Sequence, residues 1–501
     1  MRVVIGIDIG TTNTKAVALA DGGMVLGSAS VSYPVFTDST GRHELDPDVL
    51  LAAVVTSLRE VIEKMVAAGL AGRVSKGKGL SGISLSCAMH SLIAVDEDGH
   101  PLTRAITWAD VRSEDYAHAL KGTDIGKRIY AATGTPIHAM SPLCKLLWMR
   151  EQQSLVFQRA ARFISIKEYV WRRLFGKYRV DHSLASATGL FDIRRRVWNP
   201  ESLELAGIDA GKLSEPVPCT YWEAGLLPGW ASLGLPADLP FVIGSSDGCL
   251  ANLGTGVVRR GDAALTIGTS GAIRMTTAAP ETDVLERIFS YVLADGYYVS
   301  GGATNNGGNV LQWYAEQVLN RRGDDAAELE RLVAEADTVA PGCEGLVFLP
   351  YLLGERAPVW DAHARGVFFG IRSIHDQRHF LRAALEGVSY SLRQTGASLE
   401  ETIGPIERIY ASGGFTRSPI WLQLMADIFQ KKVVVTGSAD ASAVGAAQLG
   451  FYALGVLPGL DAIASLVKVE AVYEPDGGRA GVYQRNYEIF TELYSRLKDL
   501  M

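Results

Sequence analysis

The start of the chain alternates between short apolar runs and polar turns. Apolar runs at residues 2–9, 14–20 and 24–33 predict three strands, joined by a Gly-Thr-Thr turn and an Asp-Gly-Gly turn. Because both connections are short, we expect the three strands to form an antiparallel meander.

The next segment changes to a helical period. Apolar side chains in residues 46–70 recur at three- and four-residue spacing, with Asp46 in the N-cap position and Pro47 in the first helical position. The predicted elements that follow are strands near 81–86 and 91–95, helices near 143–151 and 165–174, a Pro/Gly-rich loop at 215–240, and a helix near 484–500.

A second polar hairpin, half a chain length later, repeats the first. Residues 265–274 (LTIGTSGAIR) have the same order of strand, Gly-Thr-hydroxyl turn and strand as the opening segment. Two short matches can arise by chance. Together with the loop at 215–240 they predict two similar α/β domains, each presenting one hairpin to a shared cleft, with boundaries at 1–245 and 246–501.

Composition and charge point to a small-molecule partner. The chain has 501 residues, 48% of them hydrophobic, a net charge of −7, and dispersed lysines and arginines, so nucleic acid and anionic membranes are not expected partners. Five scattered cysteines without a CxxC pair predict free thiols and a cytoplasmic protein. Residues 441–460 carry no charge, but their glycines, Gln448 and Pro458 favour a buried helix over a membrane span.

The first hairpin has the composition of an anion-binding turn. Glycine and small hydroxyl residues let backbone N–H groups approach a phosphate closely, although an ordinary hairpin turn has the same composition. Asp8 favours the first interpretation, because a carboxylate at the end of a buried strand is costly unless it is paired or close to a metal. Beside phosphates that metal is Mg²⁺, and Lys15 can add a positive charge.

Asp247 is the candidate general base. An apolar strand at 241–243 delivers it into a glycine-rich loop just ahead of the second hairpin. Phosphoryl transfer needs positioning, charge neutralisation and one carboxylate that accepts the proton of the attacking hydroxyl. A turn or helix cap is the alternative, and this segment alone leaves both open.

Two further segments have the order strand, Gly-Gly loop, helix, at residues 300–318 and 409–429. In the second, Ser418 and Pro419 begin a helix just after Gly413 and Gly414. Paired glycines leave a flat slot for an adenine ring, but they are also common in loops. The chain has neither a P-loop lysine motif nor a GxGxxG fingerprint.

With these motifs in order, the chain resembles the FGGY carbohydrate kinases, whose fold is shared with actin and heat-shock ATPases. Residues 140–149 and 366–386 fit the two signature stretches of that family, and the resemblance covers essentially the whole chain. It implies an α/β fold of two ribonuclease H-like domains flanking an active-site cleft, with ATP and Mg²⁺ as cofactors. The sequence does not reveal the oligomeric state, and a homodimer is one assembly to test.

The resemblance also implies roles for individual residues. Asp247 falls where the family keeps its catalytic base, and Asp8 and Asp247 are the implied metal-binding pair. The implied phosphate-binding residues are Thr11, Thr12, Asn13, Lys15, Thr269 and Ser270. The predicted nucleotide-binding residues are Gly308, Gln312, Gly413, Gly414 and Ser418.

The segments after the strand at 81–86 hold the substrate in this family. At the place where this chain has Met89 and His90, the pattern of glycerol kinases is Arg-Glu, so the resemblance disfavours glycerol as the substrate. A Met-His pair at that place is similar to the pattern of the family members that act on xylulose and gluconate. Residues 133–149 and 352–371 look most like the gluconate branch.

Gluconate has a carboxylate that a neutral sugar lacks, and an arginine fork matches a carboxylate. Arg112 and His90 are the candidates for this contact. Lys145 is a third, for which a structural role is the favoured interpretation, and Trp108 can be a pocket wall or part of the core.

The expected reaction is transfer of the γ-phosphoryl group of ATP to the terminal hydroxyl of D-gluconate, which gives 6-phosphogluconate. A xylulose kinase, or another pentulose or polyol kinase, is the alternative enzyme. A nucleotide-gated sensor on the same fold, binding ATP without phosphorylating a sugar, is the alternative from another class.

Overall fold

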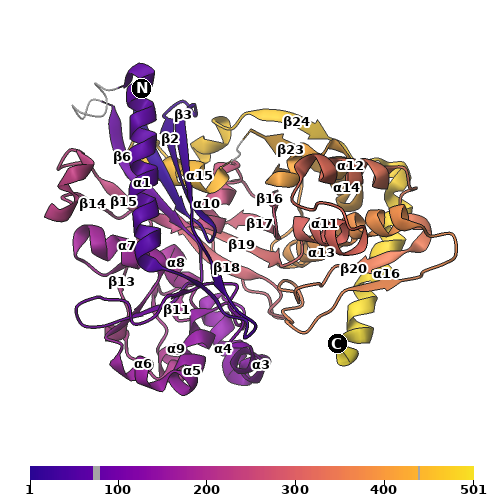
Figure 1. Cartoon of the computed structure of the whole chain (residues 1–501), viewed down its shortest axis with the longest axis horizontal. Helices are drawn as coiled ribbons and strands as arrows, with labels where there is room; N and C mark the ends of the chain where they lie inside the picture. The colour runs from indigo at the N-terminus through magenta and orange to yellow at the C-terminus, as the bar shows by residue number, and fades with distance from the viewer. Residues whose placement is uncertain (71–78, 438–439) are drawn as a thin grey trace. The chain divides into compact units, whose positions relative to one another are not determined.

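The computed structural model describes residues 1–70, 79–437 and 440–501 (Figure 1). The chain forms two compact units, each made of three segments. Unit 1 consists of Met1–Val258, Thr277–Val299 and Asp440–Val467, and unit 2 of Arg259–Thr276, Ser300–Ala439 and Lys468–Met501. The predicted boundary between two domains, at residues 245 and 246, stays a prediction.

Unit 1 is built on a six-stranded sheet with the order β14-β15-β6-β1-β2-β3. β1 and β2 pair antiparallel, as do β2 and β3, whereas β6 runs parallel to β1 and β15 runs parallel to β6. The predicted meander is therefore confirmed. The strands are β1 (Val3–Ile9), β2 (Asn13–Ala20), β3 (Val25–Ser32), β6 (Leu80–Cys87), β14 (Trp222–Glu223) and β15 (Phe241–Ser246).

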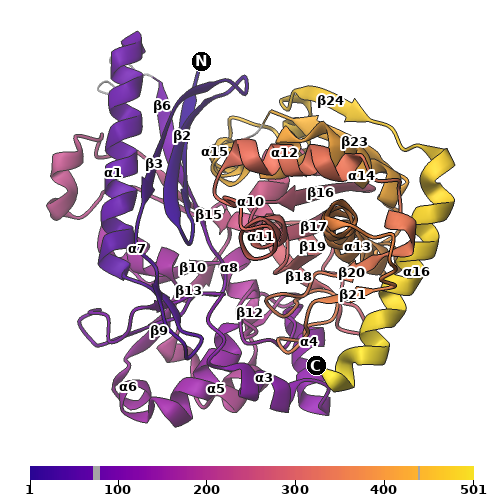
Figure 2. The ribbon, with the colours of Figure 1, turned by 45° about the vertical axis from the view of Figure 1, so that its right-hand side comes forward.

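Two helices cover opposite faces of this sheet (Figure 2). The odd residues of β1, Val3 to Ile9, pack in one core with the apolar face of α1 (Pro47–Met65). Val4 packs instead with α15 (Ala441–Ala453). At Gly6 a Cβ would lie 1.9 Å from the carbonyl oxygen of Ala443, so α15 approaches the backbone of β1 directly. By the same alternation Asp8 belongs to the face that α15 covers.

The helix boundaries predicted in unit 1 agree with the structure to within one or two residues, apart from the end of α1. The Asp46 side chain accepts hydrogen bonds from the N–H groups of Asp48 and Val49 at the start of α1. The predicted helices near 143–151 and 165–174 are α5 (Pro142–Gln152) and α7 (Ile166–Phe175). The uncharged segment after 440 begins with the buried helix α15, as expected. Within the described ranges, no helix combines the length and apolarity needed to cross a membrane.

The second sheet repeats the topology of the first. Its order is β18-β19-β17-β16-β22-β23-β24. β16 pairs antiparallel with β17 and parallel with β22, and β22 runs parallel to β23, as β1 pairs with β2 and β6 and β6 with β15. The strands are β16 (Asp262–Ile267), β17 (Gly271–Thr277), β18 (Phe289–Ala294), β19 (Tyr297–Thr304), β22 (Arg408–Ser412), β23 (Lys432–Thr436) and β24 (Val469–Tyr473).

The predicted repeat is thus confirmed, with one difference in the turns. The first hairpin closes between Ile9 and Thr14, whereas the second closes between Ile267 and Gly271, so its turn is one residue shorter. Unit 2 is completed by helices. Of these, α16 (Ala480–Leu497) packs within the unit on α13 (Gln377–Thr402), α14 (Pro419–Phe429) and β20 (Val347–Leu349) (Figure 2). The helices are α11 (Gly308–Trp313), α12 (Ala326–Asp337), α13 (Gln377–Thr402), α14 (Pro419–Phe429) and α16 (Ala480–Leu497).

Candidate active site

Two of the predicted carboxylates lie at one edge of the first sheet. Asp8 is near the end of β1, and its register partner on β6 is Ser86, whose hydroxyl donates a hydrogen bond of 2.7 Å to Asp8. Asp247 directly follows β15 and is the first residue of α10 (Asp247–Gly254). Because β1, β6 and β15 are parallel neighbours, their carboxyl ends meet at the same edge, which is where α/β sheets bind ligands.

The two carboxylates influence each other electrostatically. Burial, and then the charge of Asp247, raise the pKa of Asp8 to about 7, while Ser86 and Lys15 act in the opposite direction. Both side chains keep partial exposure at the sheet edge. Repelling carboxylates with partial access to water are a donor set that suits a hard divalent cation such as Mg²⁺. Asp8 and Asp247 therefore fit the ion that the family implies.

The contacts of Asp247 also agree in part with the alternative interpretation, in which this residue caps a turn or a helix. Oδ1 of Asp247 accepts a hydrogen bond of 2.7 Å from the N–H of Gly248, inside the first turn of α10. The hydroxyl of Ser442, on α15, donates to the carbonyl oxygen of Asp247 at 3.1 Å. A helix-terminal contact and a base role are compatible, because a carboxylate accepts several hydrogen bonds.

Sequence reasoning missed a third acid at this edge. Nζ of Lys15 lies 2.8 Å from Oδ1 of Asp440, and both side chains are about one-third exposed. The charge of Asp440 also helps to raise the pKa of Asp8. A signal was present in the sequence, because Asp440 directly precedes the uncharged helix α15 just as Asp247 begins α10.

Hydrogen bonds within unit 1 fix the turn of the first hairpin. The N–H of Gly10 donates to the carbonyl of Asn13 at 3.0 Å, and the hydroxyl of Tyr33 donates to the carbonyl of Gly10 at 2.6 Å. Thr11 is partly exposed and Thr12 is exposed. Their assignment to phosphate binding stays a prediction.

Four of the five predicted nucleotide residues line one pocket of unit 2, with a volume of about 320 Å³. They are Gly308, Gln312, Gly414 and Ser418, and the predicted phosphate residue Thr269 lines it as well. The N–H of Gly308 donates to the carbonyl of Gly268 at 2.8 Å, which ties α11 to the second hairpin. Ser418 is also the N-cap of α14, since its hydroxyl accepts from the N–H of Trp421 at 3.2 Å. Ser270 and Gly413 adjoin the lining residues in the chain.

One wall of this pocket was not foreseen. Helix α12 contributes Ala326, Leu329, Glu330 and Val333, and α14 with the turn before it contributes Phe415, Arg417 and Trp421. The pocket is therefore mainly apolar with a few polar groups, which suits a nucleoside. The amphipathic period of residues 326–337 was the available signal, but a period does not say what the apolar face covers.

Gly413 provides a test of the pocket. Its φ is +95°, and a Cβ would lie 2.4 Å from the carbonyl oxygen of Ile267. Replacing it with alanine shifts the turn that carries Gly414, so we expect Gly413→Ala to raise the KM for ATP about tenfold and to leave the KM for the sugar within about twofold. Steady-state kinetics with each substrate varied in turn checks this. An unchanged KM for ATP would contradict a nucleotide role for the turn.

His90 is held rigidly in unit 1. Its backbone has the unusual φ of +66°, its Nδ1 lies 2.7 Å from the carbonyl oxygen of Ala187, and its ring meets Tyr291 edge-on at 5.9 Å. Left-handed non-glycine residues are concentrated at functional sites. Met89 packs against two cores of unit 1, and Trp108 is partly exposed. Contact of these residues with a sugar stays a prediction.

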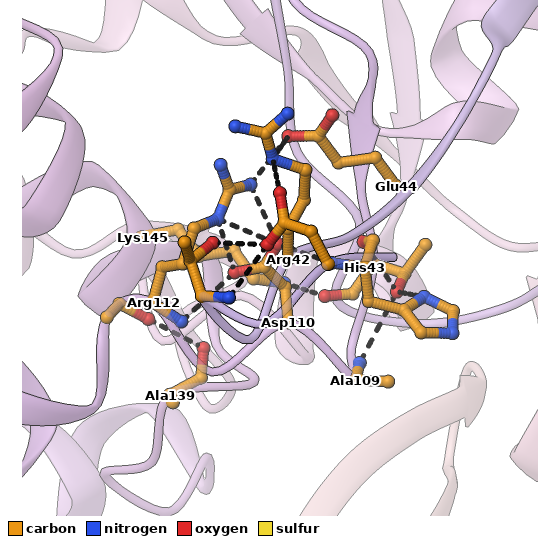
Figure 3. A network of polar contacts seen from close by, with 12 residues as sticks. Arg42, His43, Glu44, Ala109, Asp110, Arg112, Ala139 and Lys145 are labelled. Atoms are coloured by element: carbon orange, nitrogen blue, oxygen red, sulfur yellow. Dashed lines mark hydrogen bonds and ion pairs between the residues drawn. The ribbon is translucent and has the colours of Figure 1, made fainter. Parts of the chain in front are cut away.

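Arg112 is already engaged by two carboxylates (Figure 3). Its Nε and Nη2 donate to Asp110, and Nη2 also donates to Glu44 at 2.6 Å. The guanidinium carbon lies 4.5 Å from the ring centre of Trp148. Sequence reasoning foresaw a free fork for the substrate. Instead, within the described part of the chain, Nε and Nη2 donate to Asp110 and Glu44, which leaves Nη1 to contact a ligand.

Lys145 joins the predicted substrate segments to one another. The side chain is 1% exposed, and Nζ donates to the carbonyl oxygens of His90, Thr107 and Met140 at 2.6, 2.7 and 2.9 Å. Burial lowers the pKa of Lys145 to about 7, and the charge of Asp110 partly opposes this effect. Its contacts are those of a structural residue that positions three loops.

The raised pKa of Asp8 has a consequence for stability. The folded protein keeps the Asp8 proton up to about pH 7, whereas the carboxyl has a pKa of 3.8 in the unfolded chain. The free energy of unfolding therefore falls as the pH rises from about 4 to about 7. In Mg²⁺-free buffer we expect Asp8→Asn to unfold at a higher temperature than the wild type at pH 8, and the gap to close near pH 4.

Thermal unfolding of both proteins across that pH range checks this prediction. Added Mg²⁺ should raise the midpoint of the wild type more than that of the variant. Parallel pH curves for the two proteins would contradict a strained carboxyl at position 8.

Comparison with known proteins agrees with this geometry. Residues 3–254 match the N-terminal domain of the FGGY family of carbohydrate kinases, and residues 263–454 match its C-terminal domain. The chain belongs to the FGGY family of carbohydrate kinases. The predicted family and the predicted fold of two actin-like domains are both confirmed.

Relatives within the FGGY family include enzymes for different sugars. The chain is 42% identical to a gluconokinase of Bacillus subtilis (strain 168), over 99% of this chain and 96% of that protein. A gluconate kinase structure from Lactobacillus acidophilus is 33% identical with a TM-score of 0.91, covering 99% of this chain and 98% of that one. A xylulose kinase structure from the same organism is 32% identical with a TM-score of 0.91, covering 99% of both chains.

Proposed function

We propose that this FGGY kinase transfers the γ-phosphoryl group of ATP to the terminal hydroxyl of D-gluconate, giving 6-phospho-D-gluconate and ADP. The observation that carries the choice of gluconate is the 42% identity to a gluconokinase over nearly the whole chain. The fold alone does not select the sugar, because the gluconate kinase and xylulose kinase structures match equally well. Xylulose is therefore the second candidate substrate.

Asp247 is proposed as the general base. It lies at the carboxyl edge of the sheet, and its charge reaches Asp8 strongly enough to shift the pKa of that group. As a carboxylate it accepts the proton of the attacking hydroxyl, which contributes roughly 10²- to 10⁴-fold to the rate in general base catalysis. Mg²⁺, held by Asp8 and Asp247, would neutralise charge on the phosphate oxygens.

The hairpins and the pocket of unit 2 are proposed to hold ATP. Thr11, Thr12, Asn13 and Lys15 of the first hairpin, with Thr269 and Ser270 of the second, would bind the phosphates. The nucleoside would occupy the pocket lined by Gly308, Gln312, Gly414 and Ser418. The apolar walls of the pocket and its size support this assignment.

The substrate carboxylate is proposed to meet Nη1 of Arg112, with Met89, His90 and Trp108 as neighbouring walls. Because Asp110 and Glu44 already balance the charge of Arg112, this contact would be weaker than a full two-pronged pairing. Xylulose has no carboxylate, so Arg112→Met should separate the two sugars. A homodimer and a cytoplasmic location stay predictions.

A substrate panel tests the proposal. Initial rates of ADP release are measured with gluconate, xylulose, ribulose, glycerol and erythritol, each over the same range of concentrations. We expect gluconate to have the highest kcat/KM, and Arg112→Met to lower it for gluconate more than for any neutral sugar. A higher kcat/KM for xylulose would reassign the substrate. ADP release that no sugar stimulates would instead support a nucleotide-gated sensor.

A further inference from the structure

Lys167 and Asp181 form a buried ion pair in unit 1, close to the end of β15. Nζ of Lys167, in the first turn of α7, is 2.7 Å from Oδ2 of Asp181, the last residue of β10 (Arg179–Asp181). The two side chains are 1% and 0% exposed. Removing two charges from water costs about as much as their attraction returns, so a pair of this kind adds little net stability compared with apolar residues. Its use must lie in what it holds in place.

Lys167 also holds the strand that delivers Asp247. Its Nζ donates to the carbonyl oxygen of Ser245 at 2.9 Å, two residues before Asp247. At this point β15 is irregular, because its register with β6 shifts between Val242 and Ser245. Gly244 has a φ of +75°, and a Cβ there would lie 1.7 Å from the carbonyl oxygen of Leu85. The strand therefore bulges just before the proposed base, and bulges of this kind redirect side chains at active sites.

Asp181 holds the same strand from a second direction. Its Oδ1 accepts a hydrogen bond of 2.9 Å from the N–H of Leu184 and so caps α8 (His182–Ser186). In that first turn, the hydroxyl of Ser183 donates to Oγ of Ser246 at 2.9 Å and accepts from the N–H of Ser246 at 3.1 Å. Ser246 is the residue directly before Asp247.

We propose that Lys167 and Asp181 are positioning residues for phosphoryl transfer, because together they fix the bulged end of β15 and thereby the direction of the Asp247 carboxylate. Lys167 acts through the Ser245 carbonyl, and Asp181 acts through α8 and Ser183. The inference rests on the proposed role of Asp247 as the base. It explains why two buried charges occupy a place that apolar side chains could fill.

The main test removes both charges at once. In Lys167→Met/Asp181→Asn neither partner is left as an unpaired buried charge, and asparagine can still cap α8. Displacing a reacting group by about 1 Å costs on the order of 100-fold in rate. We expect kcat for gluconate to fall at least tenfold, with the KM for ATP within about twofold of the wild type.

Loss of folded protein would also lower the apparent kcat, so the readout must exclude it. Rates are expressed per ATP-binding site, counted by equilibrium dialysis on the same sample, and unfolded molecules then do not enter the value. Ser183→Ala is the milder second variant, since it keeps the ion pair and removes only the contacts to Ser246. We expect it to lower kcat per site about threefold or more, again with the KM for ATP unchanged.

A matched pair in unit 2 serves as the control. Arg382 and Glu386 on α13 form another buried ion pair, with side chains 3% and 1% exposed and Nε to Oε1 at 3.0 Å. Arg382→Met/Glu386→Gln removes a comparable pair that does not contact β15, and we expect kcat per ATP-binding site to stay within about twofold.

The outcomes separate this inference from the proposed function. If the Lys167/Asp181 and Ser183 variants keep the wild-type kcat per site while Asp247→Asn loses activity, positioning by the pair is overturned and the base assignment stands. If Asp247→Asn keeps its activity, the base assignment fails and the inference falls with it. A selective loss of kcat in the Lys167/Asp181 and Ser183 variants, with the unit 2 control unaffected, supports the inference.

Discussion

Replacing Asp247 by asparagine is expected to lower kcat for gluconate phosphorylation by roughly 10²- to 10⁴-fold and to leave the Kd for ATP within about twofold. The asparagine keeps the shape of the side chain and can still accept from the N–H of Gly248, so the fold at the start of α10 is retained. What is lost is the carboxylate that takes the proton. Single-turnover rates at saturating ATP and gluconate, with ATP affinity from equilibrium dialysis, check both parts.

Asp440→Asn is the comparison variant, because it removes one negative charge from the same sheet edge. Asp440 pairs with Lys15, a proposed phosphate contact, so its loss is expected to change the KM for ATP more than kcat. If Asp247→Asn and Asp440→Asn lower kcat by the same factor, the loss of rate is explained by the lower negative charge at this sheet edge. A specific base at position 247 is then not needed.

Replacing Lys145 by methionine is expected to lower the free energy of unfolding by about 3 kcal/mol or more. The carbonyl oxygens of His90, Thr107 and Met140 would each lose a buried donor, although that of Thr107 keeps the N–H of Asp110 at 3.3 Å. An unsatisfied buried polar group costs roughly 1–3 kcal/mol. The loops that carry the proposed sugar contacts would loosen together, so the KM for gluconate should rise as well. Urea denaturation at 25 °C and steady-state kinetics measure the two effects.

Lys432→Met is the matched control for that experiment. Lys432 forms an exposed ion pair with Glu474 in unit 2, with side chains 55% and 60% exposed. Exposed pairs contribute about 0–1 kcal/mol, so the control should unfold close to the wild type. Equal losses in the two lysine variants would show that the three carbonyl contacts of Lys145 carry no special weight.

Local patterns were enough to predict the elements that build the site. The meander of β1 to β3, the Asp46 and Ser418 caps and the repeated hairpin each depend on residues within a few positions of one another. The strand ahead of Asp247 was also visible as an apolar run. Propensity, capping and turn chemistry act over these short distances, so one sequence is sufficient to read them.

Contacts between distant segments were out of reach. Lys15 and Asp440 are 425 positions apart, and no local period connects them. The same is true of Lys167 and Ser245, and of α12 as a wall of the unit 2 pocket. Residues 277–299 and 440–467 belong to unit 1 although unit 2 segments precede them in the chain, and no local pattern reports such an interleaving.

The prediction for Arg112 could not be completed without knowing which side chains bind its guanidinium group. An arginine in the substrate segment suggested a fork for a carboxylate, and the structure shows carboxylates bound there, but they belong to Asp110 and Glu44 (Figure 3). Asp110 is only two residues away, so part of this answer was in the sequence. Glu44 is brought in by pairing of β5 (His43–Leu45) with β8 (Ala105–Ile106), a long-range event.

The most direct measurement is identification of the product formed from ATP and gluconate. Phosphorus-31 NMR of the reaction mixture, with coupling to the carbon-bound protons, reports which oxygen carries the phosphoryl group. We predict one phosphomonoester on the terminal carbon of gluconate, formed in equal amount to ADP. Inorganic phosphate as the only new phosphorus species, or no consumption of ATP in the presence of gluconate and Mg²⁺, would contradict a gluconate kinase.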